Sequence, residues 1–204
     1  MKIDYNDLVF KEKIKQAGSS HVYSGEYKGQ EVAIKLFDII HPHSSLHRLY
    51  GVFNICLIEY DNLLKVREKC TEMNYALQEP IGVTRNPQGI DILISKLVKD
   101  DNGSLSNELK DAKNMIDKNF ISQLQNILYS LAEKKIYHMH LEDQRNILVH
   151  VNSGIHPVII DFQSMNETYY PWLKITKHFG MDSARKRYFR RINRMLKSLE
   201  ENLN

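Results

Sequence analysis

The sequence predicts an α+β fold in which strands fill much of the first part of the chain and helices most of the second. Residues 1–98 contain short segments of alternating apolar and polar residues separated by glycine-containing turns, which is typical of antiparallel strands. Residues 99–204 contain two segments with apolar residues at helical spacing. Because a run of strands precedes these helices, the order favours α+β over a repeating βαβ sheet.

Three strands are expected near the N-terminus. Residues 8–10, 22–23 and 32–34 are rich in apolar and β-branched side chains, with turns expected near Gly18 and Gly29. These short segments follow one another closely, so they indicate a β-meander.

A helix and two more strands complete the first part. Residues 44–69 repeat apolar side chains at helical spacing, and Gly51 weakens that pattern. Residues 76–83 and 90–97 are expected to be strands on either side of the N-P-Q-G turn at residues 86–89.

The second part begins after residues 100–104, which read D-D-N-G-S and have the composition of a linker. We therefore expect one domain at 1–98 and another at 99–204.

Helices and a short strand pair are expected in the second domain. Residues 120–131 form an amphipathic helix pattern, and two β-branched runs at 146–151 and 157–160 indicate a hairpin. The tail from residue 172 onward has helical composition. Its expected apolar face consists of Tyr188, Ile192, Leu196 and Leu199.

Composition indicates a folded, soluble chain. Of 204 residues, 42% are apolar and 26% charged, which argues against disorder along the whole length. No apolar run approaches the roughly 18 residues of a membrane span, and the first residues do not resemble a secretory signal peptide. Cys56 and Cys70 do not suggest a disulfide framework, so a reducing compartment is favoured.

The net charge of +3 is concentrated at the C-terminus. Residues 174–204 hold nine Lys or Arg and three Asp or Glu, whereas the remainder holds 19 basic and 22 acidic residues. This basic tail suggests an acidic partner or a phosphorylated surface. Nucleic acid is a poorer expectation, because few aromatic residues are interleaved beyond Tyr188 and Phe189.

Two places in the sequence carry chemical signals. Lys35 ends the segment V-A-I-K, and a lysine at the end of a buried strand is costly unless an anion meets it. Asn146 and Asp161 lie 15 residues apart, on either side of the expected short hairpin. That arrangement lets an amide oxygen and a carboxylate converge on Mg²⁺.

In this order, the segments V-A-I-K at 32–35, N-I-L-V at 146–149 and I-I-D-F at 159–162 resemble protein kinases. The resemblance spans residues 8–165. In size and ending, the chain is most similar to the minimal serine/threonine kinases that bacterial pathogens deliver through type III secretion. It implies a two-lobed fold, with a β-rich N-lobe at 1–98 and a shortened helical C-lobe at 99–204.

The resemblance also implies roles for individual residues. Lys35 would bind the α- and β-phosphates of ATP and be held by Glu59, with Glu68 as the alternative, while Asn146 and Asp161 would hold Mg²⁺. The turn at residues 15–22 resembles the glycine-rich loop that covers the phosphates, although Gly18 is its one glycine. The nucleotide-contacting residues implied are Ala17, Gly18, Ser19, Ser20, Val22, Ala33 and Lys35.

The catalytic loop departs from the kinase pattern. Five residues before Asn146, where kinases have the catalytic aspartate, this chain has Leu141. The nearby carboxylates are Glu142 and Asp143. We expect Asp143 to orient the attacking hydroxyl, with His140 as the alternative.

The end of the chain departs as well. Gln163 stands where kinases have the glycine of D-F-G, and 43 residues follow Asp161. This leaves little room for a regulated activation loop, so constitutive activity is expected.

These observations predict an ATP- and Mg²⁺-dependent serine/threonine kinase that acts on a host protein, a virulence effector secreted into the host cytoplasm. The alternative is a pseudokinase that binds nucleotide or a partner without phosphate transfer, as suggested by the irregular glycine loop and the displaced aspartate. A small-molecule kinase fits less well, because little room remains for a helical substrate lobe.

Overall fold

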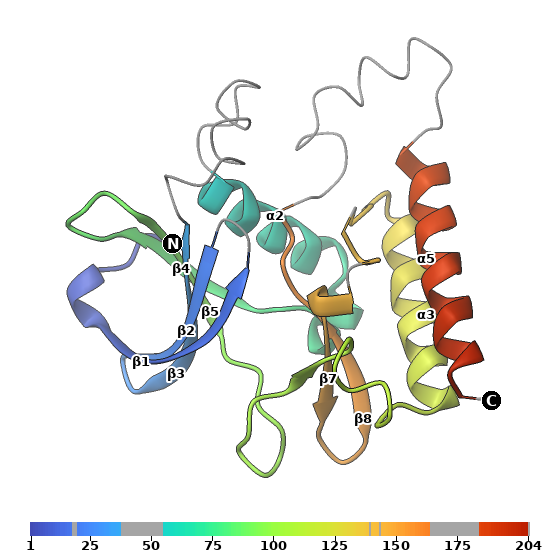
Figure 1. Cartoon of the computed structure of the whole chain (residues 1–204). Coiled ribbons are helices and arrows are strands. Elements are labelled where there is room, and N and C mark those ends of the chain that lie inside the picture. The colour runs from blue at the N-terminus through green and yellow to red at the C-terminus, as the bar shows by residue number, and fades with distance from the viewer. Residues whose placement is uncertain (18–19, 38–54, 139, 143, 164–183, 204) are drawn as a thin grey trace. The chain divides into compact units, whose positions relative to one another are not determined.

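The computed structural model of the chain describes residues 1–17, 20–37, 55–138, 140–142, 144–163 and 184–203. These residues form a five-stranded antiparallel sheet, a three-stranded sheet and three α-helices (Figure 1). The α+β prediction is therefore confirmed.

The chain divides into two compact units. The first, called here the sheet unit, comprises Met1–Leu64 and Glu79–Leu97, and the second, the helical unit, comprises Lys65–Gln78 and Val98–Asn204. The last residue of the sheet unit is Leu97, one residue before the boundary expected after residue 98. Residues 65–78 belong with the helical unit, which the sequence pattern did not indicate.

Five strands and a short helix form the core of the sheet unit. In chain order they are η1 (Tyr5–Asp7), β1 (Leu8–Ala17), β2 (Ser20–Tyr27), β3 (Gln30–Phe37), β4 (Pro80–Arg85) and β5 (Asp91–Lys96). The strand order in space is β1-β2-β3-β5-β4, and all neighbours are antiparallel. The first three strands form the expected meander, and the β4–β5 hairpin joins it through β5.

The turns of this sheet follow from residues that accept positive φ. Lys28 and Gly29 have φ angles of 50° and 78°, as in a type I′ hairpin turn between β2 and β3. Gly89 has φ 82°, and its N–H donates to the Asn86 carbonyl at 3.0 Å, closing the β4–β5 turn. The turn expected at Gly18 lies outside the described residues.

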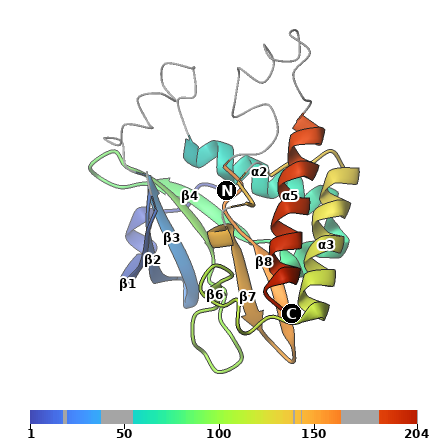
Figure 2. The same cartoon turned by 45° about the vertical axis from the view of Figure 1, so that its right-hand side comes forward.

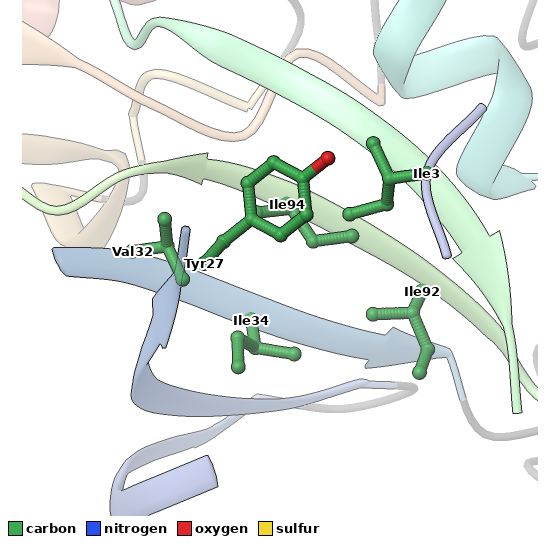
Figure 3. Close-up of a cluster of buried hydrophobic side chains, with 6 residues drawn as sticks. All are labelled: Ile3, Tyr27, Val32, Ile34, Ile92 and Ile94. Carbon is green, nitrogen blue, oxygen red and sulfur yellow. The ribbon is translucent and has the colours of Figure 1, made fainter. Parts of the chain in front are cut away.

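One face of the sheet carries a cluster of buried apolar side chains (Figure 3). Its members are Ile3, Tyr27, Val32, Ile34, Ile92 and Ile94. Ile34 on β3 pairs with Ile94 on β5, so both point to the same face. Because side chains alternate along a strand, Ala33, Lys35 and Phe37 point to the opposite face.

Helix α2 (Ile55–Lys69) contributes to both units, with Leu64 the last residue in the sheet unit. The helix expected over 44–69 is confirmed from Ile55, and residues 44–54 lie outside the described part. Within the sheet unit, α2 buries Cys56, Glu59, Tyr60, Asn62 and Leu63.

The strand expected over 76–83 begins later than predicted. Residues 71–76 form the 3-10 helix η2 (Thr71–Ala76) instead. Arg67 holds this turn, because its guanidinium donates to the carbonyls of Asn74 at 3.0 Å and Leu77 at 2.8 Å. The strand β4 starts at Pro80. Two hydrogen bonds from Arg67 therefore accompany a turn at the place where the strand was expected to begin.

The helical unit contains the smaller sheet, formed by β6 (Asn107–Glu108), β7 (Ile147–Val151) and β8 (Ile155–Ile159). The expected hairpin is confirmed by the antiparallel pairing of β7 with β8. A 3-10 helix, η3 (Gln144–Asn146), leads into β7. With two residues, β6 is too short to leave a pattern in the sequence.

Helices α3 (Lys118–Glu133) and α5 (Ala184–Glu201) pack side by side in this unit (Figure 2). The Asp117 side chain caps α3 by accepting from the Phe120 N–H at 2.7 Å. The apolar face predicted for the tail is confirmed, because Tyr188, Ile192 and Leu196 are buried. Of the tail, residues 172–183 lie outside the described part.

Among the helices that the structure describes, none combines the length and the apolar character needed to cross a bilayer.

Candidate functional site

The residues predicted to be functional fall into two groups, one in each unit. The first group centres on Lys35 of β3, whose neighbours across the sheet are Val22 on β2 and Leu93 on β5. These side chains point away from the apolar cluster. Lys35 Nζ donates to Glu59 Oε2 at 2.8 Å and to Oε1 at 3.1 Å. Of the two candidates on α2, Glu59 is thus the residue that the structure brings to Lys35.

Helix geometry explains why Glu68 is elsewhere. At 100° per residue, Glu68 projects about 180° around the helix from Glu59. Glu59 is buried, whereas Glu68 is exposed and lies beyond Leu64, in the helical unit.

The Lys35–Glu59 pair has little contact with solvent. The side chain of Glu59 is 1% exposed and that of Lys35 is 12% exposed. Lys35 Nζ also lies 5.3 Å from the centroid of the Phe37 ring. Removing charges from water is costly, so each charge depends on the other for compensation.

The charge of Glu59 also acts on the buried thiol of Cys56 on α2. Burial raises its pKa, and the carboxylates of Glu59 and Asp91 raise it further. The Cys56 thiol is therefore neutral near pH 7.

The expected nucleotide-contacting residues of the sheet unit gather on the face of Lys35. Val22 pairs with Lys35 across β2 and β3, Ala33 precedes Lys35 by two positions, and the buried Ser20 pairs with Phe37. These positions therefore share one face. Ala17 pairs with Ser20 at the end of β1. Gly18 and Ser19 lie outside the described residues.

The second group lies at one end of the β7–β8 hairpin. Ile147 pairs with Ile159, and the Ile160 N–H donates to the Asn146 carbonyl at 3.0 Å. This register places Asn146 and Asp161 next to each other at the open end of the hairpin. The backbone pairing therefore places both residues at the ends of this hairpin, as the sequence predicts.

Asp161 has an unusual backbone conformation. Its φ is 63°, in the left-handed region that non-glycine residues seldom occupy. Such conformations persist when surrounding contacts hold them, and they concentrate at functional sites.

Gln78 contributes one of those contacts. Its side-chain Oε1 accepts from the Asp161 N–H at 3.4 Å, and its own N–H donates to the Ile159 carbonyl at 3.0 Å. Sequence analysis did not single out Gln78, because nothing in its neighbourhood signals that it lies beside β8.

The side-chain amide of Asn146 is buried and oriented. Its Nδ2 donates to the His140 carbonyl at 3.0 Å, which fixes which end of the amide carries the oxygen. His140 itself has an exposed side chain. The His140 N–H donates to His138 Nδ1 at 3.3 Å.

His138 contacts the segment that follows β8. It is fully buried, its Nε2 lies 3.1 Å from the Ile160 carbonyl, and its ring makes an edge contact with Phe162 at 5.0 Å. Since Nδ1 accepts a hydrogen bond from His140, Nε2 carries the proton and donates to Ile160. Burial lowers the pKa of His138 to about 4, so the ring is neutral near pH 7.

The loop carboxylates are only partly described. Asp143, the expected hydroxyl-orienting residue, lies outside the described residues. Glu142 is exposed, and its Oε1 lies 3.2 Å from Arg191 Nη1 on α5.

The amide oxygen of Asn146 and the carboxylate of Asp161 are ligand types that Mg²⁺ takes in proteins. Mg²⁺ is usually held by one or two protein oxygens together with waters and phosphate oxygens. The described ranges hold no cluster of three or more His, Cys, Asp or Glu side chains that could hold a metal ion.

Comparison with known proteins adds no assignment: no protein-family model matches the chain, and no curated protein matches it either.

Proposed function

We propose that this chain is an ATP- and Mg²⁺-dependent protein serine/threonine kinase with a two-lobed, protein-kinase-like fold. Residues 1–98 would be the small lobe and residues 99–204 a shortened large lobe. The observation that carries the proposal is the bidentate contact of Lys35 with Glu59, two residues 24 positions apart that the kinase resemblance pairs.

Lys35 would bind the α- and β-phosphates of ATP. An ammonium has three N–H donors, so it can hold the Glu59 carboxylate and a phosphate oxygen at the same time. Glu59 restricts the lysine to one orientation, which lowers the entropic cost of binding the phosphate. Ser20, Val22 and Ala33, on the same sheet face, would border the nucleotide together with Ala17, Gly18 and Ser19.

Asn146 and Asp161 would supply the amide and carboxylate oxygens for Mg²⁺. The bound ion would neutralise charge on the phosphates as the γ-phosphoryl group moves to the acceptor hydroxyl. His138, which is neutral and hydrogen-bonded to Ile160, would keep the backbone before Asp161 in place. The rate gain would come from positioning and charge stabilisation.

The acceptor hydroxyl would be oriented by Asp143 or, as the alternative, by His140. Either residue lies within six positions of Asn146 in the sequence. A protein substrate in a host cell and delivery by type III secretion are proposed from the resemblance to effector kinases alone.

Phosphate transfer tests this proposal directly. The wild-type protein, incubated with Mg²⁺ and γ-labelled ATP, is expected to label itself or a protein in a host-cell lysate. Asp161→Asn should abolish transfer while leaving circular dichroism and thermal unfolding nearly unchanged. Asp111→Asn, at an exposed position of the same unit, is the matched control and should retain activity. Transfer at the wild-type rate by folded Asp161→Asn would refute the proposal.

A pseudokinase is the second candidate, and the contact of Glu142 with Arg191 favours it. That contact engages one of two loop carboxylates that could orient a hydroxyl. This reading predicts Mg²⁺-dependent nucleotide binding, measured by calorimetry, with no phosphate transfer to any protein. Transfer that is lost in Asp161→Asn would exclude it.

A further inference from the structure

Helix α5 has two faces of opposite character. One face is apolar and packs within the helical unit, where Tyr188, Ile192, Met195, Leu196 and Leu199 are buried. The Tyr188 hydroxyl donates to the Leu128 carbonyl of α3 at 2.9 Å, which ties the two helices together. The apolar face is therefore already used for folding.

The opposite face of α5 carries positive charge over three helical turns. At 100° per residue, five cationic side chains fall within one sector of about 100°, directly opposite the buried stripe. This cationic face consists of Lys186, Arg187, Arg190, Arg194 and Lys197. Arg187 is half-buried and the other four are exposed. The sequence has no acidic residue between 184 and 199.

The distribution of charge on α5 opposes helix stability. Arg185, Lys186 and Arg187 lie in the first turn, where the helix dipole favours acidic side chains, and Glu200 and Glu201 lie in the last turn, where it favours basic ones. Lys186 and Arg190, like Arg190 and Arg194, are also like charges four positions apart. These cations therefore do not serve helix formation, and together they give α5 a face that attracts anions.

Two contacts show that cations of this helix take carboxylate partners. Arg191, at the edge of the cationic face, lies 3.2 Å from the Glu142 carboxylate. Lys197 lies 3.8 Å from the Glu201 carboxylate. Arginine, which predominates here, can engage a carboxylate through two parallel N–H donors.

We propose that the cationic face of α5 binds an acidic, carboxylate-rich segment of a partner protein. The face extends about 16 Å from Lys186 to Lys197, and its charges recur about every 5.4 Å. An extended peptide with a glutamate at alternate positions presents one carboxylate about every 6.6 Å along one side. Long, flexible side chains can bridge that difference, so about six residues would cover the face.

A membrane or a single-stranded nucleic acid matches this face less well. Stable membrane attachment by a helix uses apolar side chains on the lipid side, whereas the apolar side of α5 faces α3. Single-stranded nucleic acid binding uses open aromatic faces for stacking. Phe189 is half-buried against the rings of Tyr129 at 5.6 Å and Tyr188 at 5.9 Å.

Binding of defined polyanions to the full chain tests this proposal. The probe is a fluorescent peptide of about 12 residues with glutamate at alternate positions and serine between them. It should bind the wild type, and raising the salt from about 50 to about 200 mM should weaken binding several-fold. The variant K186Q/R190Q/R194Q/K197Q should bind at least about ten-fold more weakly, because glutamine keeps the helix propensity but removes the charge.

The matched control is K65Q/K69Q/K110Q/K118Q, which removes four exposed lysines elsewhere in the helical unit. Its peptide affinity should stay within about two-fold of the wild type once salt is fixed. Equal loss in both variants would reduce the effect to net charge and overturn the proposal. Tighter binding of a 12-base-pair RNA duplex or of phosphatidylserine vesicles than of the peptide, lost in the α5 variant, would also overturn it. Neither variant should unfold at a lower temperature than the wild type, and the outcome does not depend on phosphate transfer.

Discussion

The ammonium of Lys35 and the carboxylate of Glu59 meet where water has little access, with 12% and 1% of each side chain exposed. Breaking such a pair from one side leaves a charge without compensation, whereas removing both charges can be nearly neutral. Comparing the removal of one charge with the removal of both therefore distinguishes the electrostatic role of the pair from its packing.

We expect Glu59→Gln to lower the free energy of unfolding by about 3 kcal/mol, since the Lys35 ammonium loses its counter-charge. The double variant Lys35→Met/Glu59→Leu should recover most of that loss, as measured by urea unfolding. Phosphate transfer should be absent from both variants. A double variant as unstable as the single one would show that the cost lies in packing.

His138 links stability to pH. Burial lowers its pKa from 6.5 to about 4, so between these values the unfolded chain binds a proton that the folded chain does not. The contribution of His138 to the free energy of unfolding is therefore fully present above pH 6.5 and is lost as the pH falls toward 4. This loss of unfolding free energy amounts to about 3 kcal/mol.

Comparison of the wild type with His138→Gln, which does not titrate, isolates this effect. We expect the free energy of unfolding in urea to fall more steeply for the wild type below pH 6.5 and to run parallel above it. An NMR titration of the imidazole should place its pKa well below 6.5. Parallel curves over the whole range would contradict the neutral, buried assignment.

Gln78 is a positioning residue for Asp161, through the hydrogen bond of 3.4 Å to its N–H. If Asp161 holds Mg²⁺ as proposed, Gln78→Ala should raise the Mg²⁺ concentration for half-maximal activity several-fold and leave the KM for ATP nearly unchanged. Gln123→Ala, which removes a side-chain hydrogen bond to His156 in the same unit, is the control. A loss of thermal stability with unchanged Mg²⁺ dependence would reduce Gln78 to a structural role.

Among the site residues, the sequence was informative where a short motif encodes a contact. V-A-I-K and N-I-L-V pointed to Lys35 and Asn146, and the structure gives each a defined, largely buried environment. Gln78 could not be found this way, because its position depends on pairing with a strand about 80 residues later in the chain. Tertiary contacts of this kind leave no local pattern.

At the scale of elements, the β2–β3 hairpin depends on a close approach at Gly25. A Cβ atom there would lie 2.3 Å from Ile34 Cδ1 and 2.5 Å from the Val9 carbonyl oxygen. The neighbouring strands β1 and β3 can therefore approach Gly25 of β2 this closely only because it lacks a side chain.

We expect Gly25→Ala to lower the free energy of unfolding by about 2 kcal/mol or more, because the added methyl group overpacks the sheet. Combining it with Ile34→Val, which removes Cδ1, should recover part of the loss but not the clash with the Val9 backbone. Thermal and urea unfolding measure both. A Gly25→Ala variant as stable as the wild type would contradict the packing of β1 and β2 around this glycine.

Element prediction succeeded where hydrophobic periodicity was sustained, as in α3 and the apolar face of α5. It failed over residues 76–79, where apolar residues imitate a strand but Arg67 fixes a turn through two backbone carbonyls. The two-residue strand β6 was missed because a period cannot be read from two positions.

At the scale of the whole molecule, the candidate catalytic residues come from two compact units, each with its own core. The sheet unit holds Lys35 and Glu59, and the helical unit holds Asn146 and Asp161. The proposed function requires both groups to act on the same magnesium nucleotide. Stability measurements on either group alone do not test that requirement.

Paramagnetic broadening by Mn²⁺ bound to a non-hydrolysable ATP analogue can test this requirement. In NMR spectra of the full chain, the side-chain amide of Asn146 and the ε-methylene of Lys35 should both broaden at the same Mn²⁺–nucleotide concentration, and Asp161→Asn should reduce both effects together. Broadening of one signal without the other, or of neither under saturating nucleotide, would contradict the proposed function.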